Sequence, residues 1–456
     1  MSYMQFPGGK LPLRSYDVCI VGAGTGGVIA AIAAARQGAK TVLIEAKGYV
    51  GGTVVEGGTA LHSFYNNFTF YKKPKTKLVE GIPQELVDRL QVRGATYGHV
   101  PMSSDCRQDS YCTSVDTELY KLIAQEFLIE EGVTLLLETR LTGALVEDGT
   151  VKAVRCVTHG GEIAIAADAF IDCTGYGDLC AMAGASYDEP NDYGVNSSIG
   201  LGGVSVPRYY QYILDEDALR DVAMADRPDG TKQIVRLDGL REKLPQEFIL
   251  KAAEVGLKTT VTCIRDDYFM FVKIEYKPQK PLTDVDEATF SAMELRRRQE
   301  KSVALLREYV PGCENAFIAR TSPAVCIRRA RAVRCDKELV DVEVTSGARF
   351  DNEIGVFGYH DEAPRRSVNE GGCFGLPYDM LLPKGIENLF AAGMMITPDH
   401  HAHMATRNTV CCMVQAQGAG VAAALISAKG IGSRQLEYPV LRAALDKQNV
   451  CFARID

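Results

Sequence analysis

Three histidines and one arginine share a short stretch near the end of the sequence, DHHAHMATRNT at residues 399–409. His400, His401 and His403 stand there with Arg407, although the whole chain has only 7 histidines. A histidine exchanges a proton near neutral pH, and a guanidinium stays charged and binds an oxyanion or carbonyl in a fork. The combination is typical of a site where a proton moves beside an anionic or carbonyl group. From these residues alone, a metal site and a plain polar loop also stay open.

Other polar residues could join the same chemistry. Arg328 and Arg331 suit an anion or carbonyl, but structural ion pairs that brace two domains would use the same residues. Tyr359, His360 and Asp361 are further candidates with no spacing argument behind them. We expect no metal, because the histidine stretch contains a single carboxylate and the chain has no C-x-x-C pair.

The start of the chain contains the elements that would position such groups. YDVCIV (16–21) and TVLIE (41–45) read as buried parallel strands, and the alanine-rich segment between them reads as a helix. A βαβ unit of this kind binds the ADP part of a dinucleotide, with glycines at the turn and an acidic residue on the ribose. The residues that match this fingerprint are Gly22, Gly24, Gly27 and Glu45.

The next segment favours FAD over NAD. Gly51–Gly52 and Gly57–Gly58 follow the acidic residue, where a plain NAD domain would continue into another helix. Residues 117–131 then read as a helix and 133–139 as a strand, and 144–175 look like an antiparallel meander. Only one dinucleotide fingerprint occurs, so we expect electrons to pass directly between substrate and flavin, with a separate electron acceptor or donor.

The middle of the chain has no comparable motif. It contains strand-like runs at 259–264 and 268–276 and an amphipathic helix near 285–308. The predicted fold class is therefore α/β, a Rossmann-type FAD-binding domain with an antiparallel meander and an inserted α+β substrate domain. The predicted boundaries are 15–186 and 375–430 for the FAD-binding domain, 187–374 for the substrate or cap domain, and 431–456 for a C-terminal tail.

Four segments together resemble the FAD-dependent oxidoreductases of the glutathione-reductase-like flavin fold, within the bacterial group related to fumarate reductase flavoproteins. They are IVGAGTGGVIAAIAAARQGAKTVLIEAKGYVGGT, IDCTGYGDLCAMAGA, FGLPYDMLLPKGIENLFAAGMMIT and RNTVCCMVQAQGAGVAAAL. The resemblance implies that the last helix presents its N-terminal N–H groups to the flavin, where they would stabilise negative charge. It implies FAD contacts for Gly22, Gly24, Gly26, Gly27, Glu45, Ala46, Gly52, Thr53, Leu141, Gly175, Asp178, Gly393, Asn408, Thr409 and Val410.

The same resemblance assigns catalytic positions on the substrate side. His400 stands at the family's single histidine position, whereas His401 and His403 are more simply solvent-facing or supporting residues. The family's arginine-rich motif usually carries another arginine where this chain has Ala332, a difference that falls on the substrate side and not on the cofactor side. The predicted catalytic set is His400, Arg407, Arg328 and Arg331.

Composition restricts the partners. A net charge of −8 and a pI near 5.6 argue against nucleic acid as the main partner. No apolar run approaches the ~20 residues of a membrane span, and no export signal is apparent, so the 14 cysteines read as reduced thiols of a cytoplasmic protein. We expect a small-molecule substrate and leave a homo-oligomer open.

Three alternatives remain at this level. The enzyme could be a fumarate-reductase-like enoate reductase, in which a cation holds the activating carboxylate. It could be a non-catalytic or RNA-modifying flavoprotein. Finally, the flavin could be attached covalently, for instance through His62.

Overall fold

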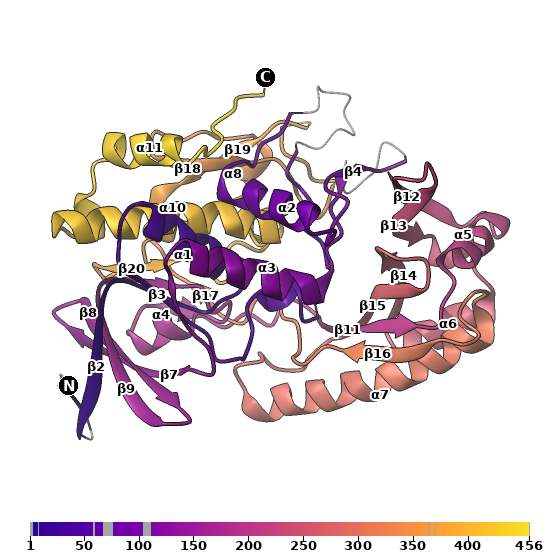
Figure 1. Cartoon of the computed structure of the whole chain (residues 1–456), viewed down its shortest axis with the longest axis horizontal. Coiled ribbons are helices and arrows are strands. Elements are labelled where there is room, and N and C mark those ends of the chain that lie inside the picture. Colours follow the sequence, from indigo (N-terminus) through magenta and orange to yellow (C-terminus); the bar gives the residue numbers. More distant parts are fainter. Residues whose placement is uncertain are drawn as a thin grey trace.

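A computed structural model describes residues 3–7, 9–57, 60–66, 76–103, 111–363, 365–369 and 371–455. Gly58, in the second glycine cluster, lies outside these ranges. Figure 1 shows two parts side by side, which we call the Rossmann part and the cap. Both termini lie on the Rossmann part (Figure 1).

A mixed sheet forms the centre of the Rossmann part. Its parallel strands run in the order β6–β3–β2–β9, and β20 pairs in parallel with the end of β9. Beyond β9 the antiparallel strands β8 and β7 form the predicted meander. The bounds are β2 (Gly9–Val21), β3 (Thr41–Ile44), β6 (Thr134–Leu136), β7 (Arg140–Glu147), β8 (Thr150–Thr158), β9 (Gly161–Asp172) and β20 (Leu389–Ala391).

Helices α1 (Thr25–Arg36), α3 (Thr117–Glu130) and α10 (Thr409–Lys429) lie on one face of this sheet (Figure 1). α10 is long and apolar enough to cross a membrane, contrary to the sequence-based expectation, but 89% of its apolar window is buried inside the protein. A Cβ added at Gly420 would lie 2.3 Å from the backbone oxygen of Ala30 in α1. The apolar composition of α10 thus reflects close packing between core helices.

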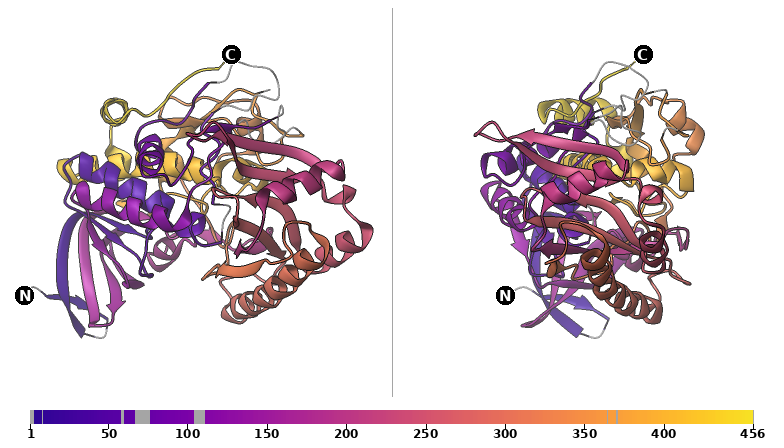
Figure 2. Two further views of the ribbon diagram at one scale, coloured as in Figure 1. Left: turned by 45° about the vertical axis from the view of Figure 1, so that its right-hand side comes forward. Right: turned by 90° about the vertical axis from the view of Figure 1, so that its right-hand side faces the viewer.

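The cap is a six-stranded antiparallel sheet in the order β12–β13–β14–β15–β11–β16. Apolar side chains on one face pack against three helices in a separate hydrophobic core. The two shorter helices lie at the outer end of the cap, away from the Rossmann part, and the longest runs along its lower side (Figure 1 and Figure 2). The bounds are β11 (Val195–Gly202), α5 (Val206–Asp215), β12 (Leu219–Asp226), β13 (Lys232–Gly239), α6 (Gln246–Glu254), β14 (Leu257–Thr262), β15 (Tyr268–Tyr276), α7 (Val285–Tyr309) and β16 (Phe317–Thr321).

Residues after the cap sheet return to the Rossmann part earlier than predicted. The cap core ends at Ala330, whereas residues from Val333 to Phe374 belong to the large core. The packing boundary therefore lies near 331 and not at 374. This segment includes α8 (Asp341–Thr345), β18 (Glu353–Phe357) and β19 (Phe374–Pro377).

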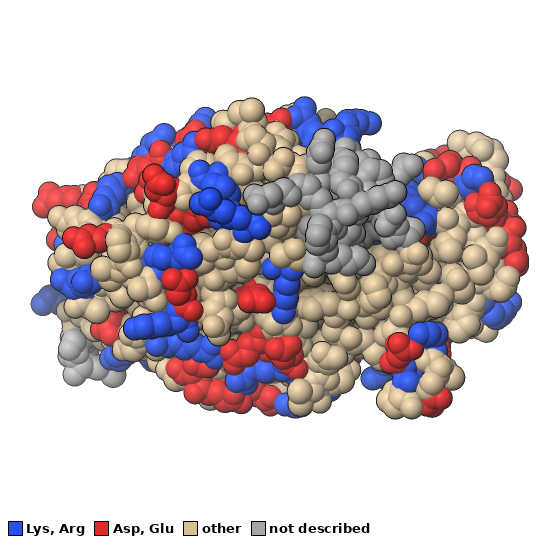
Figure 3. Space-filling view, turned by 90° about the horizontal axis from the view of Figure 1, so that it is seen from above, with Lys and Arg blue, Asp and Glu red and all other residues tan. Residues whose placement is uncertain are grey.

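The C-terminal segment is also part of the large core. Leu441 and Leu445 of α11 (Tyr438–Lys447) are buried there, so 431–456 is more than a tail. The remaining elements are β1 (Tyr3–Phe6), α2 (Ile82–Val92), β4 (Val100–Pro101), β5 (Tyr111–Cys112), α4 (Asp178–Met182), β10 (Tyr187–Asp188), β17 (Ala332–Val333) and α9 (His400–Thr406). On the face seen in Figure 3, cationic and anionic side chains are interspersed over the Rossmann part.

Candidate active site

A cavity of about 1260 Å³ runs between the Rossmann part and the cap. It is larger than the roughly 300–1,000 Å³ of common ligand pockets, so it has room for a dinucleotide and a second molecule. Its walls come from the fingerprint loop, the start of α10 and the strands of the cap sheet. The predicted cofactor residues that line it are Gly22, Gly24, Gly26, Glu45, Ala46, Gly52, Thr53, Leu141, Gly175, Asp178, Gly393, Asn408 and Thr409.

The glycines of the fingerprint leave space that side chains would fill. Gly22 has a φ of +98°, and a Cβ there would lie 2.6 Å from the Cys173 backbone oxygen. A Cβ at Gly27 would lie 1.8 Å from the Gly22 oxygen. Gly27 therefore does not line the cavity itself but lets helix and strand approach, as the fingerprint predicts.

The first turn of α1 faces this space without a competing group. Its N-cap is Gly24, which has no side-chain cap, and no acidic residue occupies the first turn. The free N–H groups and the helix dipole suit a pyrophosphate. Glu45 lies beside them, where its carboxylate accepts hydrogen bonds from the N–H groups of Ala23 (2.8 Å) and Lys47 (3.0 Å). Burial raises the pKa of Glu45, although the two hydrogen bonds act to lower it.

A second loop of the Rossmann part closes the dinucleotide side. The buried carboxylate of Asp172, at the end of β9, accepts hydrogen bonds from Thr174 and from the N–H of Cys180 (2.9 Å). This ties down the loop that carries Gly175 and Asp178. Arg331 does not line the cavity; its guanidinium donates to Asp178 at 2.8 Å. Arg331 therefore forms a structural ion pair, which was the alternative to a role in substrate binding.

The start of α10 forms the far end of the dinucleotide side. Asn408 is its N-cap and Thr409 its first residue, and both line the cavity, whereas Val410 is buried behind them. No acidic residue stands in the first turn, so the helix end is open to an anion. Gln415 accepts a hydrogen bond from the N–H of Gly393 (2.9 Å) and thereby fixes the strand end against the helix.

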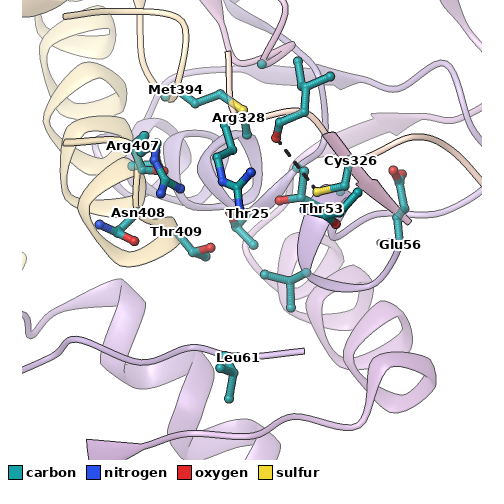
Figure 4. Close-up of a pocket in the computed structure, with 18 of the residues that line it drawn as sticks. Thr25, Thr53, Glu56, Leu61, Cys326, Arg328, Met394, Arg407, Asn408 and Thr409 are labelled. Carbon is teal, nitrogen blue, oxygen red and sulfur yellow. Dashed lines mark hydrogen bonds between the residues drawn. The ribbon is translucent and has the colours of Figure 1, made fainter. Parts of the chain in front are cut away.

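Two guanidinium groups meet beside this helix end. Arg407 and Arg328 both point into the cavity near Asn408 and Thr409 (Figure 4). Burial and the charge of Arg328 lower the pKa of Arg407 to about 10. Arg407 forms an ion pair with Asp361, which also lines the cavity. The Arg328 guanidinium donates a hydrogen bond to the backbone oxygen of Gly194 (2.9 Å), the residue directly before strand β11 of the cap.

Tyr193 lines the cavity at the same place and was missed by sequence reasoning. Its hydroxyl lies 2.9 Å from Nδ1 of His403, and Nε2 of His403 lies 2.8 Å from the Met394 backbone oxygen. Because a carbonyl only accepts, Nε2 carries the proton and Nδ1 accepts the Tyr193 hydroxyl. Burial lowers the pKa of His403 to about 3 and raises that of Tyr193, so both stay neutral at pH 7.

His400 and His401 do not line the cavity. His400 stacks on the Tyr193 ring at 4.8 Å between centroids, and its Nδ1 lies 2.7 Å from Asp192. His401 binds Glu362 at 2.9 Å. The side chains that pair with the three histidines differ: Asp192 for His400, Glu362 for His401 and the Tyr193 hydroxyl for His403. His400 also contacts the Tyr193 ring, so it reaches the cavity only through Tyr193. A catalytic role for His400 stays a prediction.

The histidine stretch forms the short helix α9 and is not the plain polar loop that the sequence left open. Asp399 caps α9 by accepting the N–H of Ala402 at 2.9 Å. An aspartate directly before HHAHMAT is a helix-start signal that the sequence did contain.

Some of the remaining candidate residues line the cavity and others do not. Tyr359 and Asp361 line the cavity, whereas His360 is buried outside it. His62 is fully buried beside Tyr120 and does not line the cavity, and burial lowers its pKa to about 3. The described geometry gives no support to covalent attachment of the flavin through His62.

The model of the FAD dependent oxidoreductase family matches residues 17–445. The chain belongs to this family. The protein binds FAD, and the glycines of the fingerprint loop, the open helix ends and the acidic residue directly after β3 fit that cofactor. The predicted fold, an FAD-binding Rossmann part with an antiparallel meander and an inserted α+β cap, is confirmed.

Individual relatives match only parts of this FAD-dependent oxidoreductase. Digeranylgeranylglycerophospholipid reductase of Methanothrix thermoacetophila is 28% identical over 166 residues, 35% of this chain and 39% of that protein. A tRNA uridine 5-carboxymethylaminomethyl modification enzyme of Geobacter metallireducens is 26% identical over 145 residues, 31% of this chain and 22% of that protein. The matches thus span well under two thirds of these curated relatives.

A solved structure shows similarity over nearly the whole chain. The geranylgeranyl bacteriochlorophyll reductase-like protein of Thermoplasma acidophilum aligns with a TM-score of 0.46 and 14% identity, covering 96% of this chain and 84% of that one.

Proposed function

We propose that this FAD-dependent oxidoreductase transfers a hydride between the flavin and a small oxygenated organic substrate. The observation that carries the proposal is the meeting of Arg407 and Arg328 in the cavity beside the start of α10 (Figure 4), with the Arg407 guanidinium 5.5 Å from the centroid of the Tyr193 ring. FAD supplies the hydride acceptor or donor when it is bound. The residues of the chain bind the substrate and handle its proton.

The two arginines would hold a carbonyl or carboxylate oxygen of the substrate. Guanidinium groups keep their charge at neutral pH and form paired hydrogen bonds with oxyanions. Arg407 is largely buried, with 16% of its side chain exposed, and donors held out of water act more strongly than they would in solution. Arg328 and Arg407 lie in different elements, so a substrate between them would be held from the cap side and from the Rossmann side.

Tyr193 and Asp361 would handle the hydroxyl or amine that loses its proton. The Tyr193 proton is directed to His403, so the Tyr193 oxygen is left as a hydrogen-bond acceptor, with the Arg407 guanidinium as one neighbouring donor. It can therefore accept and orient a substrate O–H or N–H. The Asp361 carboxylate lines the same cavity and is a suitable acceptor for the departing proton.

The second candidate is an enoate reductase. The two arginines favour it, because the carboxylate of an unsaturated acid needs cations that stabilise charge as the double bond is reduced. Anaerobic half-reactions separate the two functions. A dehydrogenase loses its yellow colour with an alcohol, amine or glycoside, whereas a reductase that has been reduced chemically regains colour with an unsaturated acid or ketone. If a broad panel gave neither change, the proposed function would be wrong.

A separate electron partner completes the cycle in this proposal, because only one dinucleotide fingerprint occurs in the sequence. Mixing the oxidised enzyme with NADPH alone in a stopped-flow instrument tests this part. Fast loss of the flavin absorbance would show that the enzyme takes hydride from NADPH and needs no other donor.

A further inference from the structure

The cap sheet turns a charged face toward the cavity. Along β15 the side chains of Val272 and Ile274 enter the cap core, while Phe271, Lys273 and Glu275 line the cavity, as the period of two in a strand requires. The neighbouring strands and their connections add further charges at the same surface. The cationic residues are Arg220, Arg236, Arg241, Lys258, Lys273 and Arg328, and the acidic ones are Asp238, Glu242 and Glu275. We call this surface the cap face.

One carboxylate at the centre of the cap face is shared by three cations. Glu275 lies 2.8 Å from the ammonium of Lys258 and 3.4 Å from the guanidinium of Arg328, and it also pairs with Lys273. A single negative charge cannot balance three positive ones, so the cluster carries excess positive charge. Lys273 is the most enclosed of the three, with 19% of its side chain exposed.

The electrostatics of these groups agree with that imbalance. Burial, together with the nearby charge of Arg328, lowers the pKa of Lys273 to about 8. Burial acts to raise the pKa of Glu275. The positive charges of Lys273 and Lys258 have the larger combined effect and lower this pKa to about 2. Arg236 is also buried on this face, at 7% exposure, and Arg220 pairs with Asp238 at 3.2 Å. An anion that enters the cavity would stabilise the excess positive charge of Lys258, Lys273 and Arg328 around Glu275.

We infer that the cap face binds a phosphate or carboxylate group carried by the substrate, at a distance from the atoms that react with the flavin. The inference rests on the proposed function in one point: the reacting end of the substrate lies between Arg328 and Arg407. It narrows the substrate class to molecules with an anionic group beyond the oxidised or reduced carbon. Such remote binding energy would position the reacting end.

Binding of simple anions to the FAD-loaded enzyme tests the inference without a turnover assay. Inorganic pyrophosphate, inorganic phosphate and malonate are titrated at constant ionic strength, and thermal unfolding of the holoenzyme is followed. Bound FAD already fills the pyrophosphate site, so added anions report on the cap face and on the Arg328–Arg407 pair, and variants of the cap-face lysines separate the two. We expect a saturable rise in the unfolding temperature, because a ligand that binds only the folded state stabilises it.

Two variants and a matched control locate the binding. Lys273→Met and Lys258→Gln each remove one charge of the cluster and should weaken anion binding about tenfold. Lys232→Gln is the control, because Lys232 lies on the neighbouring strand β13, is exposed and does not line the cavity. Equal weakening in the control, or full binding in Lys273→Met, would overturn the inference, as would the absence of saturable stabilisation.

The pH dependence gives an independent readout. Lys273 faces Glu275, Lys258 and Arg328, and it binds an anion only while it is protonated. Anion affinity should therefore be full below about pH 8 and fall as the pH rises above it. The decline should be absent in Lys273→Met, and a decline that persists there would contradict the assignment.

The preferred anion identifies the group. Tighter binding of phosphate or pyrophosphate indicates a phosphorylated substrate, and tighter binding of malonate indicates a carboxylate. Rapid reduction of the flavin by NADPH, with loss of that reaction in Lys273→Met, would place the anion on the electron donor and overturn the inference. Because anion binding is measured without turnover, its failure is distinct from a failure of the flavin half-reactions that test the proposed function.

Discussion

The two sides of the cavity are made of different kinds of groups. Around α1 the Rossmann side presents backbone N–H groups and glycines, with Glu45 beside them, and its Arg407–Asp361 ion pair lies at the other end near α10. The cap face presents long charged side chains from four strands and their connections. The first arrangement suits one invariant cofactor, because backbone positions are fixed by the fold. The charges of the cap face can be altered by single substitutions that leave the cofactor site unchanged.

This contrast explains why the cofactor is easier to assign than the substrate. A backbone cradle depends on close approach, which glycines reveal in the sequence. A charged surface depends on which strands lie side by side and which face each residue takes. If the two sides are separable, a substitution on one side should leave the function of the other side intact.

The largest effect should come from the Rossmann side. In Gly27→Ala the new Cβ would lie 1.8 Å from the Gly22 oxygen, so the helix and strand cannot keep their spacing. We expect complete loss of FAD, measured as the ratio of flavin to protein absorbance after purification. Gly160→Ala is the control, since its Cβ meets only the Thr158 hydroxyl at 3.6 Å and the variant should purify yellow. Full FAD content in Gly27→Ala would contradict the packing argument.

Removal of a cation at the centre of the cavity should spare the cofactor and slow the reaction. Arg407→Met should reduce kcat by about 10² to 10³ with whichever substrate changes the flavin colour, as for the loss of one oxyanion donor. The FAD content should stay unchanged. Since Asp361 would lose its partner, the double variant Arg407→Met with Asp361→Asn controls for misfolding. Unaltered kinetics would exclude Arg407 from the site.

Tyr193→Phe should have an intermediate effect. The ring and its stack on His400 remain, but the hydroxyl that lies 2.9 Å from His403 is removed. We expect a loss of about tenfold to hundredfold in kcat/KM, with unchanged FAD content and unfolding temperature. A lower unfolding temperature with normal kinetics would show that the hydroxyl serves only stability.

The smallest effect should come from His400→Ala. His400 does not line the cavity and acts on the substrate only through Tyr193 and Asp192. We expect a smaller loss of kcat/KM than in Tyr193→Phe, with FAD retained. A loss as large as that of Arg407→Met would establish the direct role that the sequence predicted, and the comparison of the two sides would need revision.

Sequence reasoning succeeded where function depends on neighbours in the chain. The fingerprint residues Gly22 to Gly27 and the acid at Glu45 belong to one βαβ unit, so their spacing reports their geometry. It was less complete for the substrate side. Arg407 and Arg328 line the cavity as expected, but Arg331 turns to Asp178, and nothing in the sequence around Tyr193 marks it as a lining residue.

The sequence by itself determined the class of cofactor and the course of the chain around it. Only the tertiary structure decided which histidine supports Tyr193, which arginines share a cavity, and that Lys258, Lys273 and Arg328 surround one carboxylate. The physical reason is that strand register and helix packing fix these contacts, and both depend on burying two separate cores. A charged side chain carries no local signal of the partner that folding will place beside it.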